Sequence, residues 1–208
     1  MDRMKEVLHI DNFIEGQVKS KEWITLSLLY LMETKAYSEI KITEIAKKSG
    51  LARQTIYRNY QDKDDILYEY LCHQYNFFDN ELSEEELTEE AVFISFFQKW
   101  KEYTTYPLFL NIQLSDRKIR QIIYRSLEYL IQNKYVKYFM SPQSSTNELY
   151  VYAFRSFASI LHSILIEWTL QRYKQSPEEI GLLTYQLTNS IREYCNQIPV
   201  TSPSRREE

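Results

Sequence analysis

Hydrophobic residues recur at helical spacing along most of the chain. Between Lys19 and Lys35, the residues Leu28, Leu31 and Met32 fall on one face, and apolar positions three and four residues apart are typical of an amphipathic helix. With only 3 glycines and 5 prolines in 208 residues, few positions interrupt such segments, and an all-α fold is expected. The same spacing predicts two short helices within residues 41–63, a long helix from residue 62 to about 82, and helices over residues 91–105, 107–114, 116–140, 147–174 and 177–197.

The two short helices within residues 41–63 are joined by a glycine. Gly50 stands where the chain reverses, and glycine adopts a positive φ there without steric cost. Ala46, four residues earlier, is small enough to let two helices cross closely, and Ile56 and Tyr60 continue the apolar face on the second helix. This combination is typical of a helix-turn-helix, whose second helix enters the major groove of DNA.

The segments Ile45–Leu51 (IAKKSGL) and Thr55–Leu67 (TIYRNYQDKDDIL) carry a family pattern. With them the chain resembles the DNA-binding domain of TetR/AcrR-family transcriptional regulators over about residues 19 to 70. The resemblance implies an N-terminal three-helix DNA-binding unit, joined by a long helix to a C-terminal helical bundle for ligand binding and dimerisation. We expect the first domain, with an N-terminal arm and the connecting helix, in residues 1–82, and the second in residues 83–208. The connecting helix either transmits motion or is a passive strut.

Three residues depart from the pattern of that family. Ala36 stands where glycine commonly ends the first helix, and Lys41 and Ala52 stand where threonine or serine commonly caps the second and third helices. The loss of a hydroxyl cap costs about 0.5 to 2 kcal/mol per helix end. We therefore expect a DNA-binding unit that is less rigid than in a typical relative, although Lys41 could contact a phosphate instead.

The recognition helix offers several side chains suited to DNA. Arg53 matches the paired acceptors of guanine, and Gln54 matches adenine. By resemblance to the family, Tyr57 and Lys63 hold phosphates. An alternative role for the charged residues is only to keep a helical surface soluble. The predicted DNA-binding set is Lys41, Thr43, Lys48, Arg53, Gln54, Thr55, Tyr57, Arg58 and Lys63.

Charge is distributed unevenly along the chain. The whole chain carries a formal net charge of −4, yet residues 41–63 contain six basic and two acidic side chains. A local basic patch on an acidic body attracts phosphate at one place and repels DNA elsewhere. The acidic segment of residues 82–90 begins a helix with a capping-box pattern at Ser83 and Glu86, and we place the domain boundary there. It could alternatively dock a basic partner.

Catalytic, metal-binding and export signals are not expected in this sequence. His9, His73 and His162 are isolated, and the sequence contains no glycine-rich phosphate loop or nucleophile elbow. Cys72 and Cys195 are expected to be free thiols of a reducing compartment. Without an evident export signal or a run of 18 apolar residues, we expect a non-enzymatic, cytoplasmic protein without cofactor, metal site or membrane partner.

The C-terminal part is rich in aromatic residues, which are 15% of the whole chain. Such side chains more commonly form a core than a ligand site. Members of the resembled family, however, commonly hold a small-molecule effector between these helices, where tyrosine hydroxyls, an arginine or a histidine could orient it. The predicted effector-binding residues are Trp100, Tyr103, Tyr106, Tyr124, Phe154, Arg155, Phe157 and His162.

The last two predicted helices carry apolar residues suited to a four-helix bundle between two chains. A homodimer with twofold symmetry would place two recognition helices about one DNA turn apart on a palindromic double-stranded operator. An intramolecular hairpin is the alternative. The sequence thus favours a dimeric repressor released by a small-molecule effector, and the rival is an adaptor or activator controlled by a protein coregulator. The predicted interface residues are Ile160, Ile164, Leu170, Leu183, Leu187 and Ile191.

Overall fold

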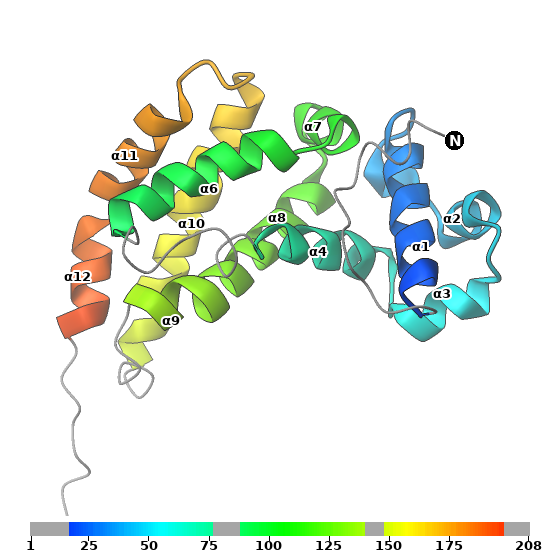
Figure 1. Ribbon diagram of the computed structural model, residues 1–208, viewed down its shortest axis with the longest axis horizontal. Helices are drawn as coiled ribbons and strands as arrows, with labels where there is room; N and C mark the ends of the chain where they lie inside the picture. Colours follow the sequence, from blue (N-terminus) through cyan, green and yellow to red (C-terminus); the bar gives the residue numbers. More distant parts are fainter. Residues whose placement is uncertain (1–16, 77–87, 140–147, 198–208) are drawn as a thin grey trace, which may run out of the picture. The chain divides into compact units, whose positions relative to one another are not determined.

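The computed structural model describes residues 17–76, 88–139 and 148–197, and every regular element in these ranges is a helix (Figure 1). The expected all-α fold is confirmed. The chain forms two compact units, of which the first contains residues 1–75 and 102–126 and the second contains residues 76–101 and 127–208. Because these units interleave along the chain, the division between residues 82 and 83 stays a prediction.

The first unit contains the helices that precede and form the helix-turn-helix, together with a later pair. These elements are α1 (Gln17–Met32), the 3-10 turn η2 (Tyr37–Glu39), α2 (Ile42–Ser49), α3 (Arg53–Asn59), α4 (Lys63–Gln74), α7 (Tyr106–Gln113) and the first part of α8 (Arg117–Leu130). Their apolar faces meet in one core, in which the side chains of Leu28, Ile45, Ile56, Ile66 and Ile112 are completely buried.

The second unit is a helical bundle with an aromatic core. Its elements are α6 (Glu89–Tyr103, of which residues 102 and 103 belong to the first unit), the rest of α8, the π-helical turn η3 (Ile131–Tyr135), α9 (Val136–Phe139), α10 (Glu148–Leu170), α11 (Pro177–Leu187) and α12 (Asn189–Gln197). Phe97 on α6 meets Trp168 on α10 edge to face at 5.4 Å between ring centroids. The indole nitrogen of Trp100 donates to the hydroxyl of Thr169 at 3.1 Å, which satisfies a polar group inside this core.

Several predicted helices end or break elsewhere in the structure. The first helix, predicted to Lys35, ends at Met32, and the helix predicted over residues 116–140 is interrupted by η3. The helix predicted to end at residue 174 ends at Leu170, because Arg172 and Tyr173 adopt positive φ angles of 57° and 58°. The helix predicted over residues 177–197 is divided at Thr188, whose hydroxyl donates to the carbonyl of Thr184 at 2.7 Å. The connecting helix, predicted to continue to about residue 82, ends at Gln74, after which Tyr75 forms its C-cap. The predicted N-terminal arm up to residue 16, the capping box at Ser83 and Glu86, the loop at residues 141–146 and the C-terminal tail lie outside the described residues.

The helix α10 is unusually apolar. Its segment Leu149–Leu170 is long and apolar enough to cross a membrane by length and composition, with a mean hydropathy of 1.4, although polar residues interrupt it. One such helix is weak evidence for a membrane span, because the core helix of a water-soluble protein meets the same criterion. Here one face of α10 enters the core through Phe157, Leu161 and Leu165.

Candidate nucleic-acid interface

The turn between α2 and α3 has the geometry expected from the sequence. Gly50 lies in the left-handed region with φ 72° and ψ 12°, directly after the last residue of α2. Ile45 and Ile56 are completely buried, and Ala46 is 8% exposed, so the apolar faces of the two helices are turned inward. The opposite face of α3 is left for recognition.

The helix starts lack side-chain caps, as the sequence indicated. Neither Lys41 before α2 nor Ala52 before α3 accepts a hydrogen bond through its side chain. Glu44 compensates in part, because its carboxylate accepts from the main-chain amide of Lys41 at 2.9 Å. The ammonium of Lys35 also donates to Glu44 at 2.9 Å and, with that amide, lowers the pKa of the Glu44 carboxyl. Half of a capping box thus fixes the first turn of α2.

Most of the predicted DNA-binding side chains lie on the surface of this unit. Thr55 is half-buried, and Tyr57 keeps 57% of its surface exposed although it is a large aromatic residue. Arg53, Gln54 and Thr55 occupy the first turn of α3, which a helix-turn-helix presents to base edges. The exposed residues of the set are Lys41, Thr43, Lys48, Arg53, Gln54, Tyr57 and Arg58.

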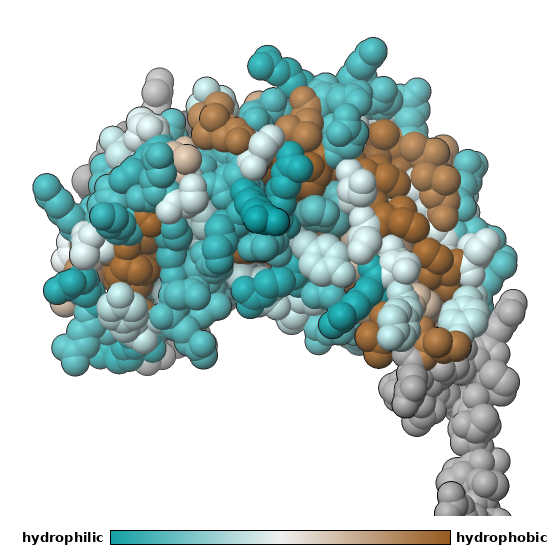
Figure 2. Space-filling model, turned by 180° about the vertical axis from the view of Figure 1, so that it is seen from behind, coloured by the Kyte–Doolittle hydropathy of each residue, from teal (hydrophilic) through white to brown (hydrophobic). Residues whose placement is uncertain are grey.

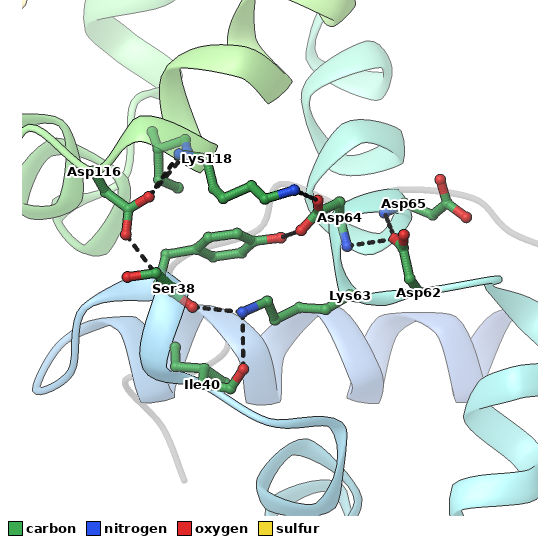
Figure 3. Close-up of polar contacts among 10 residues, drawn as sticks. Ser38, Ile40, Asp62, Lys63, Asp64, Asp65, Asp116 and Lys118 are labelled. Atoms are coloured by element: carbon green, nitrogen blue, oxygen red, sulfur yellow. Dashed lines mark hydrogen bonds and ion pairs between the residues drawn. The ribbon is translucent and has the colours of Figure 1, made fainter.

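Two lysines of the predicted set are engaged inside the unit. The ammonium of Lys48 lies 3.2 Å from the ring centroid of Tyr30, a cation–π contact between α2 and α1. The ammonium of Lys63 donates to the carbonyl oxygens of Tyr37 at 2.6 Å and Ile40 at 2.8 Å (Figure 3). Burial lowers the pKa of Lys63 despite nearby carboxylates. In the free protein Lys63 therefore supports the turn before α2.

The start of α4 lies beside this turn. The Asp62 carboxylate accepts from the main-chain amides of Asp64 and Asp65 at 2.8 and 3.1 Å, and so caps the N-terminus of α4. The phenol of Tyr37 donates to Asp64 at 2.6 Å, and Lys118 pairs with the same carboxylate at 3.2 Å (Figure 3). Burial, and next the bond to Asp64, raise the pKa of the Tyr37 phenol far above its ordinary value. This hydroxyl therefore stays a donor at any physiological pH.

A comparison with models of protein families matched residues 29–70 to "Bacterial regulatory proteins, tetR family". The chain carries a tetR-family DNA-binding domain. The matched residues contain α2, α3 and the turn between them, which we call the reading head. The family resemblance noted in the sequence is confirmed. A comparison with curated protein sequences gave no match.

Solved structures of transcription regulators share the fold over most of the chain. A TetR transcriptional regulator from Streptococcus agalactiae 2603V is 16% identical with a TM-score of 0.56, covering 83% of this chain and 94% of its own. A regulator from Streptomyces coelicolor is 14% identical with a TM-score of 0.51, covering 82% and 81%. The dihydroxyacetone kinase operon activator DhaS is 16% identical with a TM-score of 0.51, covering 86% and 99%. The helical body is therefore built like that of these proteins.

The predicted effector-binding residues do not all belong to one unit. Tyr103, Tyr106 and Tyr124 lie in the first unit, where Tyr106 keeps 66% of its surface exposed. The other five lie in the second unit, where Trp100, Phe154 and Phe157 are buried, Arg155 is exposed and His162 is half-buried. The three buried aromatic side chains belong to the core of this unit.

Sequence reasoning missed a polar cluster in the second unit. Arg192 on α12 is 2% exposed and pairs with Glu89 in the first turn of α6. Its guanidinium lies 4.3 Å from the ring centroid of Tyr185, and the phenol of Tyr135 donates to Glu89 at 2.8 Å. The ring of Tyr135 also packs on Phe93 at 5.9 Å. No local pattern signals this cluster, because Glu89 and Arg192 are 103 residues apart.

The predicted dimer residues lie on α10 and α11, except Ile191, which lies on α12. Figure 2 shows apolar side chains on the surface of α10 and α11. Leu183 and Leu187 are 43% and 56% exposed on α11. The other four residues, Ile160, Ile164, Leu170 and Ile191, are half-buried, so none of the six is enclosed by the single chain.

Proposed function

We propose that this DNA-binding transcription regulator is a dimeric repressor that reads a palindromic operator and is released by a small-molecule effector. The observation that carries the proposal is the tetR-family reading head with an exposed basic and amide face on α3. Arg53 and Gln54 are proposed to read base edges, with Thr55 and Arg58 beside them. Lys41, Thr43, Lys48, Tyr57 and Lys63 are proposed to hold the phosphate backbone.

Selection of bound sequences from a random DNA pool with the full chain tests this reading. The selected site should contain two inverted half-sites. Arg53→Ala should then relax the preference at one base pair per half-site, a loss of about 1 to 3 kcal/mol in discrimination, while Gln61→Ala on the exposed turn after α3 serves as a control. An unchanged sequence preference in Arg53→Ala would refute direct readout by this residue.

The dimer is proposed to form through α10 and α11. Leu183 and Leu187 leave apolar surface in water, and a four-helix contact with a second copy would bury it. Leu183→Glu with Leu187→Glu should give monomers in sedimentation at micromolar concentration, whereas Asn196→Glu, on the exposed surface of α12, should not. A wild-type protein that sediments only as a monomer would contradict the proposal.

The effector is proposed to bind the helical body, where aromatic side chains such as Trp100, Phe154 and Phe157 can surround an apolar molecule. A thermal-shift panel of apolar, cationic and aromatic compounds tests for it. A true effector raises the melting temperature because it binds only the folded state, and it should also lower operator affinity. A panel without any stabilising compound would count against an effector site.

A second candidate is an activator or adaptor controlled by a protein coregulator. The support for it is that the similar protein DhaS is described as an operon activator. A reporter gene placed behind the selected operator separates the two functions. Expression that rises on deletion of the regulator favours the repressor, whereas expression that falls, with a partner that copurifies on the operator, favours the activator.

A further inference from the structure

The turn that precedes α2 is held by side chains from outside the tetR-family domain. The main-chain amide of Tyr37 donates to Oδ1 of Asn111 at 2.7 Å, and the next amide, that of Ser38, donates to Oδ2 of Asp116 at 2.9 Å. Asn111 lies on α7 and Asp116 immediately precedes α8, and both are outside residues 29–70. Two consecutive amides in the turn before α2 are thus bound by side chains at the corner between α7 and α8.

Asn111 is fixed in a single orientation. Its side chain is completely buried, and its amide nitrogen donates to the carbonyl oxygens of Met32 and Pro107, both at 2.9 Å. These bonds identify the oxygen that accepts from Tyr37, because the two ends of the amide have different partners. Asn111 therefore joins the end of α1, the turn before α2, and α7.

Asp116 divides its two carboxylate oxygens between two elements. Oδ1 accepts from the main-chain amides of Lys118 at 2.8 Å and Ile119 at 3.3 Å, and so caps α8. Oδ2 accepts from the amide of Ser38 (Figure 3). Burial opposes ionisation of this carboxyl, yet the hydrogen bonds from Ser38, Ile119 and Lys118 hold its pKa below the ordinary value. The charged form that accepts all three amides is therefore the stable one.

The carbonyl side of the turn is held by Lys63, which donates to Tyr37 and Ile40, and α2 begins at Ile42. Between Ile40 and the start of α2 stands Lys41, which has no side-chain acceptor with which to cap the helix. The direction in which α2 leaves this turn therefore depends on the contacts around the turn. Because α3 follows α2 across Gly50, the same contacts orient the recognition helix.

We propose that Asn111 and Asp116 are positioning residues for DNA recognition, which hold the reading head in its binding pose through the amides of Tyr37 and Ser38. Neither residue has to touch DNA for this role. The inference rests on the proposed reading of DNA by α3. It adds that side chains at the corner between α7 and α8 are needed to orient α3 for DNA binding. A head that leaves its pose binds with an apparent affinity reduced by the fraction of competent molecules.

The decisive variant is Asp116→Asn in the full chain. Asparagine keeps an oxygen for the amides that begin α8, but its NH2 group faces the amide of Ser38, and two donors cannot bond. Operator affinity should fall about three- to tenfold with an unchanged slope of log affinity against log salt, because no phosphate contact is lost. Amide exchange should accelerate at Ser38. If Asp116→Asn acted only by removing a negative charge, it would strengthen DNA binding. The predicted loss of affinity has the opposite sign and so distinguishes positioning from charge.

Two controls separate positioning from charge and from general destabilisation. Glu39→Gln removes a negative charge from the same turn at an exposed position and should leave affinity unchanged or slightly higher. Ile166→Val trims a buried residue of the second unit and should lower the melting temperature without changing operator affinity well below that temperature. If Asp116→Asn binds the operator within twofold of wild type, the inference is overturned. If the wild-type chain binds no selected DNA, the proposed function fails instead.

Discussion

Replacing Lys63 with alanine should destabilise the first unit by about 2 kcal/mol. The ammonium donates two hydrogen bonds, of 2.6 and 2.8 Å, to Tyr37 and Ile40, and bonds of charged groups contribute about 1.5 to 3 kcal/mol each. Its contact with the Tyr37 ring, at 4.3 Å from the centroid, adds about 0.5 to 1 kcal/mol. The cost of burying the charge, which also lowers the pKa of Lys63, opposes these contributions and reduces the net effect.

Urea unfolding and salt-dependent operator binding separate the two roles of Lys63. A loss of about 2 kcal/mol corresponds to a fall of about 4 to 8 °C in melting temperature for a chain of this size. If the third N–H of the ammonium also holds a phosphate, the salt slope should flatten by about one unit. Lys47→Ala, which removes an exposed lysine from α2, should change stability by less than about 0.5 kcal/mol. If Lys63→Ala changed stability by less than about 0.5 kcal/mol, Lys63 would not support the turn before α2. If the salt slope stayed unchanged, Lys63 would not contact a phosphate.

Three further predictions concern packing and charge. Gly181→Ala should cost about 1 to 2 kcal/mol in urea unfolding, because its Cβ would lie 2.7 Å from the backbone Cα of Ile94 and the gain in helix propensity offsets only part of the strain. Arg192→Met should cost about 3 kcal/mol by the same measurement, since Glu89 loses its buried partner; Glu89→Gln should cost less. Wild type should exceed Asp116→Asn in stability by about 2 kcal/mol at pH 7. Because the folded pKa of Asp116 is lowered, this difference should be full above its unfolded pKa of about 3.9 and vanish as the pH falls through the folded value.

The reading head was predictable because its determinants are local. The reversal at Gly50, the small Ala46 and the apolar Ile56 lie within eleven residues of sequence, and each acts on its immediate neighbours. The absence of side-chain caps at Lys41 and Ala52 was equally visible, since a cap depends on residue type at one position. The exposure of the charged face of α3 follows directly from the helical period.

The long-range bonds inside each unit could not be predicted from local sequence patterns. The bond between Tyr37 and Asn111 joins residues 74 positions apart, and asparagine at such a position carries no periodic signal. The same is true of the pair formed by Arg192 and Glu89. Helix ends were missed for a related reason, because the division at Thr188 depends on a hydroxyl that bonds backward to the preceding turn and on the guanidinium of Arg192 beside it.

The missing caps do not leave the start of α2 without support, because Glu44 accepts from the amide of Lys41 and tertiary bonds hold the turn before the helix. A local cap would fix α2 whatever the rest of the chain did, whereas Asn111 and Asp116 fix it only while α7 and α8 keep their places. One carboxylate, that of Asp116, spans α8 and the turn, so a shift of about 1 Å in the first turn of α8 would lengthen the bond to Ser38 from 2.9 Å to beyond the range of a hydrogen bond. The proposed positioning of α2 and α3 therefore depends on where the corner between α7 and α8 lies within the same unit.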